Sequence, residues 1–214
     1  TLLVWSAALL FDLPALVRMA QLALAASGIA FALLTLQLQS RRRRARADTT
    51  FRYWQLGLMA SALALLMPWL AVAFPVLAAR AAWAPSFGIL LIVGGFLSFI
   101  TGMLYKIVPF LTWLECYGPV MGRKPTPRVQ DLMVERRDEP WFVLYFVGVL
   151  GGTVALLAGA PNLFRMTAAM TLLATTAIVV ELVLARRLFN VAAAVRFPEG
   201  TTPPHLFLPA IRSH

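Results

Sequence analysis

Three ionisable side chains stand within, or at the edge of, long apolar stretches of the sequence: Glu181, Lys106 and Glu115. Charged groups are costly inside a bilayer, and those found there often bind ligands or carry protons. Glu181 lies in the run AIVVELVLARR and is the best candidate for an intramembrane carboxylate. Two interpretations stay open for it: a functional carboxylate, or the partner of Arg186 or of a basic residue on a neighbouring helix.

Lys106 and Glu115 lie near the end of one apolar stretch, and each also has two interpretations. Lys106 faces an acidic group of a substrate or cofactor, or its ammonium reaches the inner headgroups beside Tyr105, as long basic side chains do. Glu115 relays protons or binds a ligand, or it forms an interfacial ion pair with Arg123 or Lys124. The second interpretation is favoured in both cases.

The sequence holds few residues that ligate metals or act as nucleophiles. A single cysteine, Cys116, excludes an internal disulfide and a cysteine-based zinc or iron–sulfur site formed by this chain alone. Both histidines, His205 and His214, follow the last apolar stretch, whereas haem or copper inside a bilayer usually needs intramembrane histidine. Met103 and Met170 are therefore interpreted as core residues, and no nucleotide-binding or nucleophile motif appears. We predict no catalytic or metal-binding residue, and the cofactor stays open.

The composition is that of an integral membrane protein. Hydrophobic residues make up 60% of the chain and charged residues 13%, whereas a soluble domain averages about 25% charged residues. The mean hydropathy is +0.78. The net charge of +10 comes mostly from short loops and from the ends of apolar stretches, a pattern that suits contact with anionic lipid headgroups. The expected partners are membrane lipids and other membrane subunits, not nucleic acid.

Five stretches are long enough for a membrane-spanning helix, which needs about 20 mainly apolar residues. They lie near residues 15–39, 53–79, 86–114, 141–159 and 163–184. We predict an all-α, polytopic transmembrane helical bundle over residues 1–196, with a proline-rich cytoplasmic tail at 197–214 that is irregular and lies along a partner. An apolar segment precedes the first span, and because it starts directly at Thr1 we expect residues to be missing before it.

Prolines predict irregularities in two of these spans, because proline cannot donate the hydrogen bond that continues a helix. Pro68 and Pro75 predict a kink or an early end in the second span. The third span is longer than one crossing requires, so we expect either a strong tilt or a bend at Pro109 into an interfacial segment.

An arginine cluster between the first two spans fixes the expected orientation. It comprises Arg41, Arg42, Arg43, Arg44 and Arg46. Because Lys and Arg concentrate in cytoplasmic loops, this loop, the polar loop at 117–140 and the segment after residue 186 are expected to lie in the cytoplasm. The predicted localisation is a bacterial inner membrane that the chain crosses several times.

Small residues recur every four positions on two spans. Gly94, Ser98 and Gly102 do so on the third span, and Gly148 and Gly152 on the fourth. Such faces let two helix backbones approach closely. They would also admit a flat porphyrin or chlorin, but helix packing is the commoner use and is the prediction here.

The segment from Thr101 to Glu115, TGMLYKIVPFLTWLE, resembles a segment of poorly characterised proteobacterial membrane proteins related to the haem-copper oxidase catalytic subunit. The polar loop that follows is similar as well, at residues 117–118, 122–125, 131–133 and 135–136. The resemblance implies an all-helical bundle of about a dozen spans, of which this chain is the later part. Those relatives tend to carry histidine after the tryptophan, where this sequence has Glu115, so no metal ligand is carried over to any residue here.

Three functions follow as hypotheses. The first is a non-catalytic subunit or assembly partner of a larger inner-membrane energy-transducing complex, respiratory or photosynthetic. The second is a transporter or permease fragment in which Lys106, Glu181 and the prolines of the second span line a path. The third is a degenerate oxidase-like haem protein whose ligands lie in missing N-terminal residues. Direct catalysis by this chain alone is not expected.

Overall fold

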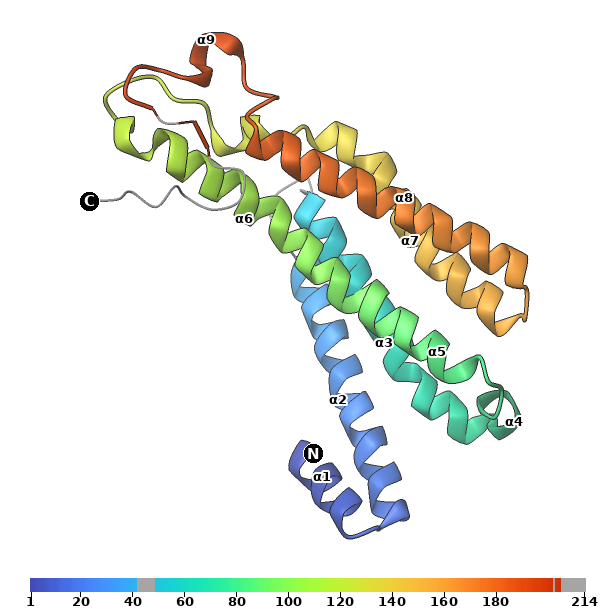
Figure 1. The fold of residues 1–214 in the computed structure, drawn as a ribbon. Helices are drawn as coiled ribbons and strands as arrows, with labels where there is room; N and C mark the ends of the chain where they lie inside the picture. Colours follow the sequence, from blue (N-terminus) through green and yellow to red (C-terminus); the bar gives the residue numbers. More distant parts are fainter. Residues whose placement is uncertain (42–48, 202, 205–214) are drawn as a thin grey trace.

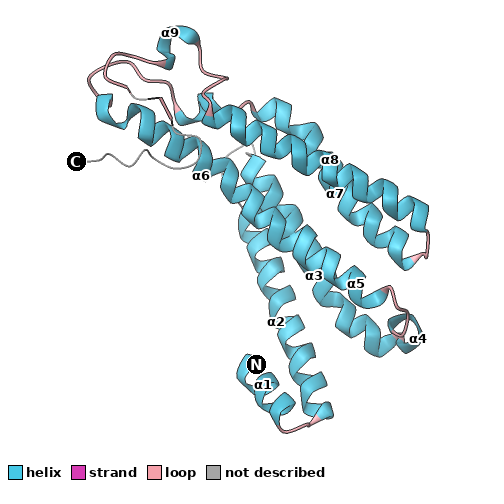
Figure 2. Ribbon diagram, viewed as in Figure 1, coloured by secondary structure: helices cyan, strands magenta, loops and turns pink. Residues whose placement is uncertain are grey.

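The chain folds entirely into helices and connecting loops within the residues that the structure describes. The structure is a computed structural model that describes residues 1–41, 49–201, 203 and 204, without the side chains of residues 135, 136 and 194. Figure 2 shows helices as the only regular elements of this part of the chain. The predicted all-α bundle is thereby confirmed. Arg42, Arg43, Arg44 and Arg46 of the arginine cluster fall outside the described residues.

Long helices make up most of the fold (Figure 1). They are α2 (Pro14–Ser40), α3 (Thr49–Ala73), α5 (Trp83–Gly88) with η1 (Ile89–Leu97) and α6 (Ser98–Tyr117), α7 (Glu135–Leu157) and α8 (Pro161–Arg186). The η1 segment is a π-helix that continues α5 into α6. Short helices complete the fold: α1 (Leu2–Leu10), α4 (Pro75–Ala78), η2 (Gly118–Val120), η3 (Val129–Leu132) and α9 (Ala193–Arg196).

Five helical segments are long and apolar enough to cross a membrane: Pro14–Ser40, Thr49–Ala73, Trp83–Val120, Arg137–Leu157 and Pro161–Arg186. They match the five predicted spans in order and approximate position. The chain is therefore a multi-pass membrane protein.

Two spans have a bound that differs from the approximate one predicted, each near a proline. The second has the early end that was one of the two predicted outcomes: α3 ends at Ala73 rather than near residue 79, and Pro75 starts α4, where its missing N–H costs nothing. The fourth was expected to start at residue 141, but α7 begins at Glu135 and includes Pro140. The turn before Pro140 is anchored from outside the helix, since it carries Arg137, which pairs with α8, and the buried Asp138.

Two prolines that the sequence analysis singled out, Pro68 and Pro109, lie inside helices. Pro68 is within α3 and Pro109 within α6, so neither ends its helix. The α6 helix continues past Pro109 to Tyr117, which accounts for the unusual length of the third span.

The small-residue face of the third span packs on α3. A Cβ at Gly94 would lie 2.8 Å from the Ala60 Cβ, and one at Gly102 would lie 3.0 Å from the Tyr53 Cβ. Ser98 is fully buried between them, and its hydroxyl donates to the Gly94 carbonyl at 2.6 Å. These contacts bring the backbones of α3 and of η1–α6 into close approach.

The second small-residue face lies between α7 and α8, which form the hairpin at the right of Figure 1. A Cβ at Gly148 would lie 2.3 Å from the Thr171 Oγ1 and 3.0 Å from the Thr167 carbonyl oxygen. A Cβ at Gly152 would lie 3.3 Å from the Thr167 Oγ1. The close packing of α7 on α8 therefore requires glycine at this crossing.

Basic residues gather at one end of the bundle, which we call the basic end. Its described members are Arg41, Arg52, Arg123, Lys124, Arg128, Arg137, Arg186, Arg187 and Arg196. The C-terminal part of α6, the start of α7, the end of α8 and α9 all lie at this end (Figure 1). Arg80 and Arg165 lie near the opposite end, beside the connections that follow α4 and α7.

The start of the proline-rich tail is fixed to the basic end. The Tyr117 hydroxyl donates to the Arg196 carbonyl at 2.8 Å, and the Lys124 Nζ lies 3.0 Å from the Glu199 Oε2. Lys124 holds the pKa of the Glu199 carboxyl below its usual value, because the ammonium donates a hydrogen bond to the carboxylate and attracts its charge. Residues 197–201 thus contact the chain itself, and most of the remaining tail lies outside the described residues.

Candidate functional site

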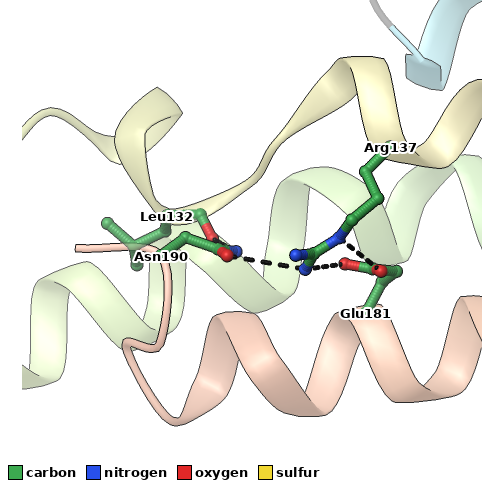
Figure 3. A network of polar contacts seen from close by, with 4 residues as sticks. All are labelled: Leu132, Arg137, Glu181 and Asn190. Atoms are coloured by element: carbon green, nitrogen blue, oxygen red, sulfur yellow. Dashed lines mark hydrogen bonds and ion pairs between the residues drawn. The ribbon is translucent and has the colours of Figure 1, made fainter.

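An ion pair joins α7 to α8 at the basic end. Arg137 donates two hydrogen bonds to Glu181, from Nε to Oε1 at 2.7 Å and from Nη2 to Oε2 at 2.5 Å (Figure 3). The Glu181 side chain is 8% exposed and the Arg137 side chain 40% exposed. This two-pronged geometry satisfies both carboxylate oxygens, which is the strongest form of such a pair.

The ion pair extends into a small polar network. The Arg137 Nη2 also lies 3.5 Å from the Asn190 Oδ1, and the Asn190 Nδ2 donates to the Leu132 carbonyl at 3.0 Å (Figure 3). Asn190 follows α8 and Leu132 ends η3, so the network ties two loops to the α7–α8 hairpin. The Glu181 partner is thus a basic residue on a neighbouring helix, one of the two predicted alternatives, and it is Arg137 rather than Arg186.

A second polar group lies deeper in the bundle, where α3, α6 and α7 meet. Tyr53, Tyr105 and Asp138 are buried, with exposed fractions of 0%, 7% and 1%. The rings of Tyr53 and Tyr105 stack at a centroid distance of 5.6 Å, and Asp138 is within electrostatic reach of both hydroxyls. The sequence analysis misses this group, because it assigns Asp138 to the polar loop at 117–140.

A pattern in the sequence does contain the signal that places Asp138. Asp138 precedes Phe142, Tyr145 and Val149 at helical spacing, and these three are buried in the same core as Tyr53. Extending the apolar face of α7 backward across Pro140 by one turn puts Asp138 on the inner side. The proline hid the continuity of that face.

Tyr145 connects this core to the π-helix. Its hydroxyl donates to the Val93 carbonyl in η1 at 2.5 Å, and the side chain is almost completely buried. Helical segments with the wider π register are rare and are often found at functional sites. Here Tyr145 of α7 supplies a hydrogen-bond donor to a backbone carbonyl of the π-helix.

Replacing Tyr145 with phenylalanine is expected to lower the free energy of unfolding by about 1–3 kcal/mol, because the partly buried Val93 carbonyl loses a hydrogen-bond donor. Reversible unfolding in mixed micelles measures the change. Thr176→Val is the control, because it removes an exposed hydroxyl that bonds only to the Leu172 carbonyl of its own helix. Equal effects of the two variants would show that the Tyr145 hydroxyl does not support the π-helix.

Glu115 takes part in a third polar group, on the outer surface of the bundle between α6 and α8. Its Oε2 lies 2.5 Å from the Arg186 Nη2, and the Arg186 Nη1 lies 3.3 Å from the Thr112 Oγ1. The expected partners were Arg123 or Lys124, whereas the structure places Arg186 against Glu115 and Glu199 against Lys124. The correction has a simple cause, because α6 and α8 pack together and bring Arg186 closer than the loop residues.

This pair lies at one end of an open apolar groove of about 610 Å³ between α6 and α8. The apolar lining is Val108, Leu111, Leu114, Val179, Leu182 and Val183, and the polar lining is Thr112, Glu115 and Arg186. The groove is therefore apolar along most of its length and polar at the basic end.

The remaining candidate residues lie apart from these polar groups. Lys106 is exposed on α6, and Met103 is also exposed on that helix. Cys116 is buried as a free thiol. Among the residues that the structure describes, no three His, Cys, Asp or Glu side chains come together to hold a metal ion.

The chain matches no family model, no curated protein and no solved structure. The chemistry of the three polar groups is therefore read from their geometry alone. Two of them are neutralised ion pairs, and the third, Tyr53, Tyr105 and Asp138, combines two hydroxyls with a buried carboxyl.

Proposed function

We propose that the chain is a non-catalytic integral membrane subunit of a larger bacterial inner-membrane complex, with its basic end in the cytoplasm. The complex belongs to the energy-transducing class, respiratory or photosynthetic. That last part rests on the resemblance of residues 101–136 to oxidase-related membrane proteins. The orientation rests on the rule that Lys and Arg concentrate on the cytoplasmic side of short loops.

The groove between α6 and α8 is the observation that carries this proposal. Ionisable residues within transmembrane segments almost always face the interior of a helical bundle or a water-filled cavity. Glu115 and Arg186 instead line a groove that opens on the outer surface of this chain, with side chains 29% and 19% exposed. An apolar helix of another subunit that covers the groove would turn this surface into the interior of a larger bundle.

Exposed apolar residues along the groove suit such a helix. Leu111 and Leu114 on α6 and Val179 on α8 are each about half exposed. Because lipid removes the hydrophobic driving force between helices, a helix gains most in such a groove from close packing and from polar contacts. The groove offers an apolar wall for packing and Thr112, Glu115 and Arg186 for polar contacts.

Site-specific photocrosslinking in native membranes tests the proposal. A benzophenone side chain at position 111, inside the groove, is expected to give a single crosslinked adduct with another membrane subunit. That subunit is also expected to copurify with the chain in a constant ratio after mild detergent extraction. The matched control is Leu173 on α8, which is similarly exposed but does not line the groove. It is expected to label lipid only.

Two results would contradict the proposal. One is lipid labelling alone at both positions together with a monodisperse single chain in mild detergent. The other is a subunit adduct of equal yield at Leu111 and Leu173, since that would place the contact elsewhere. Redox or pigment-bearing subunits in the recovered complex would support its assignment to the energy-transducing class, and a complex without them would contradict that assignment.

A further inference from the structure

A second groove, with a volume of about 580 Å³, lies on the outer surface of the α7–α8 hairpin. Its lining is Glu139, Pro140, Val143, Leu144 and Val147 from α7 and Met170 from α8. Val143 and Val147 are each about half exposed. Glu139 stands in the first turns of α7, which start at the basic end (Figure 1). The second groove is therefore apolar over most of its length and ends in a carboxylate at the basic end.

The carboxylate at this end is paired with an arginine from another helix. The Arg52 Nη1, from α3, lies 2.5 Å from the Glu139 Oε1, and the two side chains are 41% and 53% exposed. Because this described contact uses one nitrogen and one oxygen, the guanidinium keeps donors and the carboxylate keeps an acceptor for a further group. The end of the second groove thus presents a positive and a negative charge side by side.

The length of α7 places this ion pair at the boundary of the bilayer core. Residues 140–157, from the proline to the end of α7, rise about 27 Å at about 1.5 Å per residue. The hydrocarbon core of a bilayer is about 30 Å thick. A bilayer that α7 crosses therefore has headgroups near Glu139 and acyl chains beside Val143 and Val147. The ion pair and the apolar lining meet at the depth where the headgroup and the chains of a phospholipid meet.

We propose that the second groove binds a phospholipid with an ethanolamine headgroup, and that the Arg52–Glu139 pair is its headgroup site. An acyl chain lies along the apolar lining. The phosphate accepts hydrogen bonds from the Arg52 guanidinium, and the ammonium donates to the Glu139 carboxylate. Both are charge-assisted hydrogen bonds, which are the stronger kind. The four charges alternate in sign around the site, so each lies between two opposite charges.

This pattern of charges favours ethanolamine over two other phospholipid headgroups. Phosphatidylglycerol carries the phosphate but no cation, so it brings a second negative charge to Glu139 without a partner for it. Phosphatidylcholine carries a cation, but its quaternary nitrogen has no N–H to donate. The Glu115–Arg186 pair in the groove between α6 and α8 is more buried, with side chains 29% and 19% exposed, so a hydrated headgroup reaches it less easily.

Native mass spectrometry of the full chain in mild detergent tests the proposal, with the three phospholipids titrated at the same acyl composition. Phosphatidylethanolamine is expected to bind about tenfold more tightly than the other two, because it gains one charge-assisted hydrogen bond. Glu139→Gln should remove most of this preference, and Arg52→Met should weaken the binding of all three lipids. Glu199→Gln is the matched control and should keep the preference, since Glu199 forms an exposed ion pair at the basic end but does not line the second groove.

A bulky side chain in the second groove tests the site of the acyl chain separately. Val147→Trp fills the groove and should weaken the binding of all three phospholipids while the ion pair stays in place. Val154→Trp is its control, because Val154 is exposed on α7 but does not line the second groove. The proposal is overturned if the native chain binds the three phospholipids equally or binds phosphatidylglycerol most tightly. It is also overturned if the preference survives Glu139→Gln, if Glu199→Gln removes it equally, or if Val147→Trp binds lipid as Val154→Trp does.

Discussion

Arg137→Met is expected to lower the free energy of unfolding by about 3–5 kcal/mol, because it leaves the Glu181 carboxylate buried without its partner. The Glu181 side chain is only 8% exposed, and both of its oxygens lose their donors when the guanidinium is removed. The same variant also removes the contact with Asn190 that ties the loop after α8 to the pair. Reversible unfolding in mixed micelles of mild and denaturing detergent measures the change.

The two halves of the pair are not expected to be equivalent. Glu181→Leu leaves an arginine whose side chain is 40% exposed and can extend toward the headgroups, so its cost should be clearly smaller than that of Arg137→Met. The double variant Arg137→Met, Glu181→Leu should recover much of the loss, since an apolar pair of similar volume often replaces a buried ion pair at little cost. A double-mutant cycle gives the coupling between the two residues.

A second ion pair provides the control for this cycle. The Arg52 Nη1 lies 2.5 Å from the Glu139 Oε1 and joins α3 to α7, but its side chains are 41% and 53% exposed. Because exposed pairs contribute about 0–1 kcal/mol, Arg52→Met should have a small effect. Similar losses in Arg52→Met and Arg137→Met would contradict the role assigned to burial at Glu181.

The positions of the spans followed from the sequence because length and apolar composition are local properties. A run of about 20 apolar residues must be helical in a bilayer, since only then are its backbone groups satisfied. The same reasoning succeeded at Pro75, where α3 has the predicted early end, but failed around Pro140, where tertiary contacts let a helix continue through the proline. Because the span was predicted to begin after Pro140, Asp138 was placed outside it, and the buried polar group that Asp138 forms with Tyr53 and Tyr105 was not predicted.

The pairing of charges could be predicted only in part, because it depends on which helices are neighbours. Arg137 and Glu181 are 44 positions apart, and no local pattern links them. The sequence prediction for Glu115 chose nearby loop residues, whereas Arg186 reaches it across the α6–α8 contact. Small residues gave better guidance, since Gly94, Gly102 and Gly148 each lie at a helix crossing.

These crossings explain how the polar groups are held in register. The pair Arg137–Glu181 requires α7 and α8 to lie close at the basic end, and Gly148 sits further along the same interface. Tyr53 and Tyr105 require α3 and α6 to be equally close, which Gly102 permits through its approach to Tyr53. A side chain added at Gly102 or Gly148 is therefore expected to displace these polar groups, although neither glycine belongs to them.

Gly148→Ala is expected to have the second large effect, lowering the free energy of unfolding by about 1–3 kcal/mol through overpacking of the α7–α8 interface. The added Cβ would lie 2.3 Å from the Thr171 Oγ1 and 3.0 Å from two backbone atoms, the Thr167 oxygen and the Thr171 nitrogen. A hydroxyl can rotate away, but the backbone atoms move only if the helices separate. Gly148→Val should cost more for the same reason.

Two further variants separate this steric effect from a general effect of alanine. Gly88→Ala on α5 places its Cβ where no heavy atom lies within 4 Å, so its effect should stay within about 0.5 kcal/mol or stabilise the helix slightly. Thr171→Ala combined with Gly148→Ala removes the 2.3 Å contact but keeps both backbone contacts. It should therefore restore only part of the lost stability. Full restoration would show that the threonine hydroxyl, and not the approach of the two backbones, limits the size of the residue at position 148.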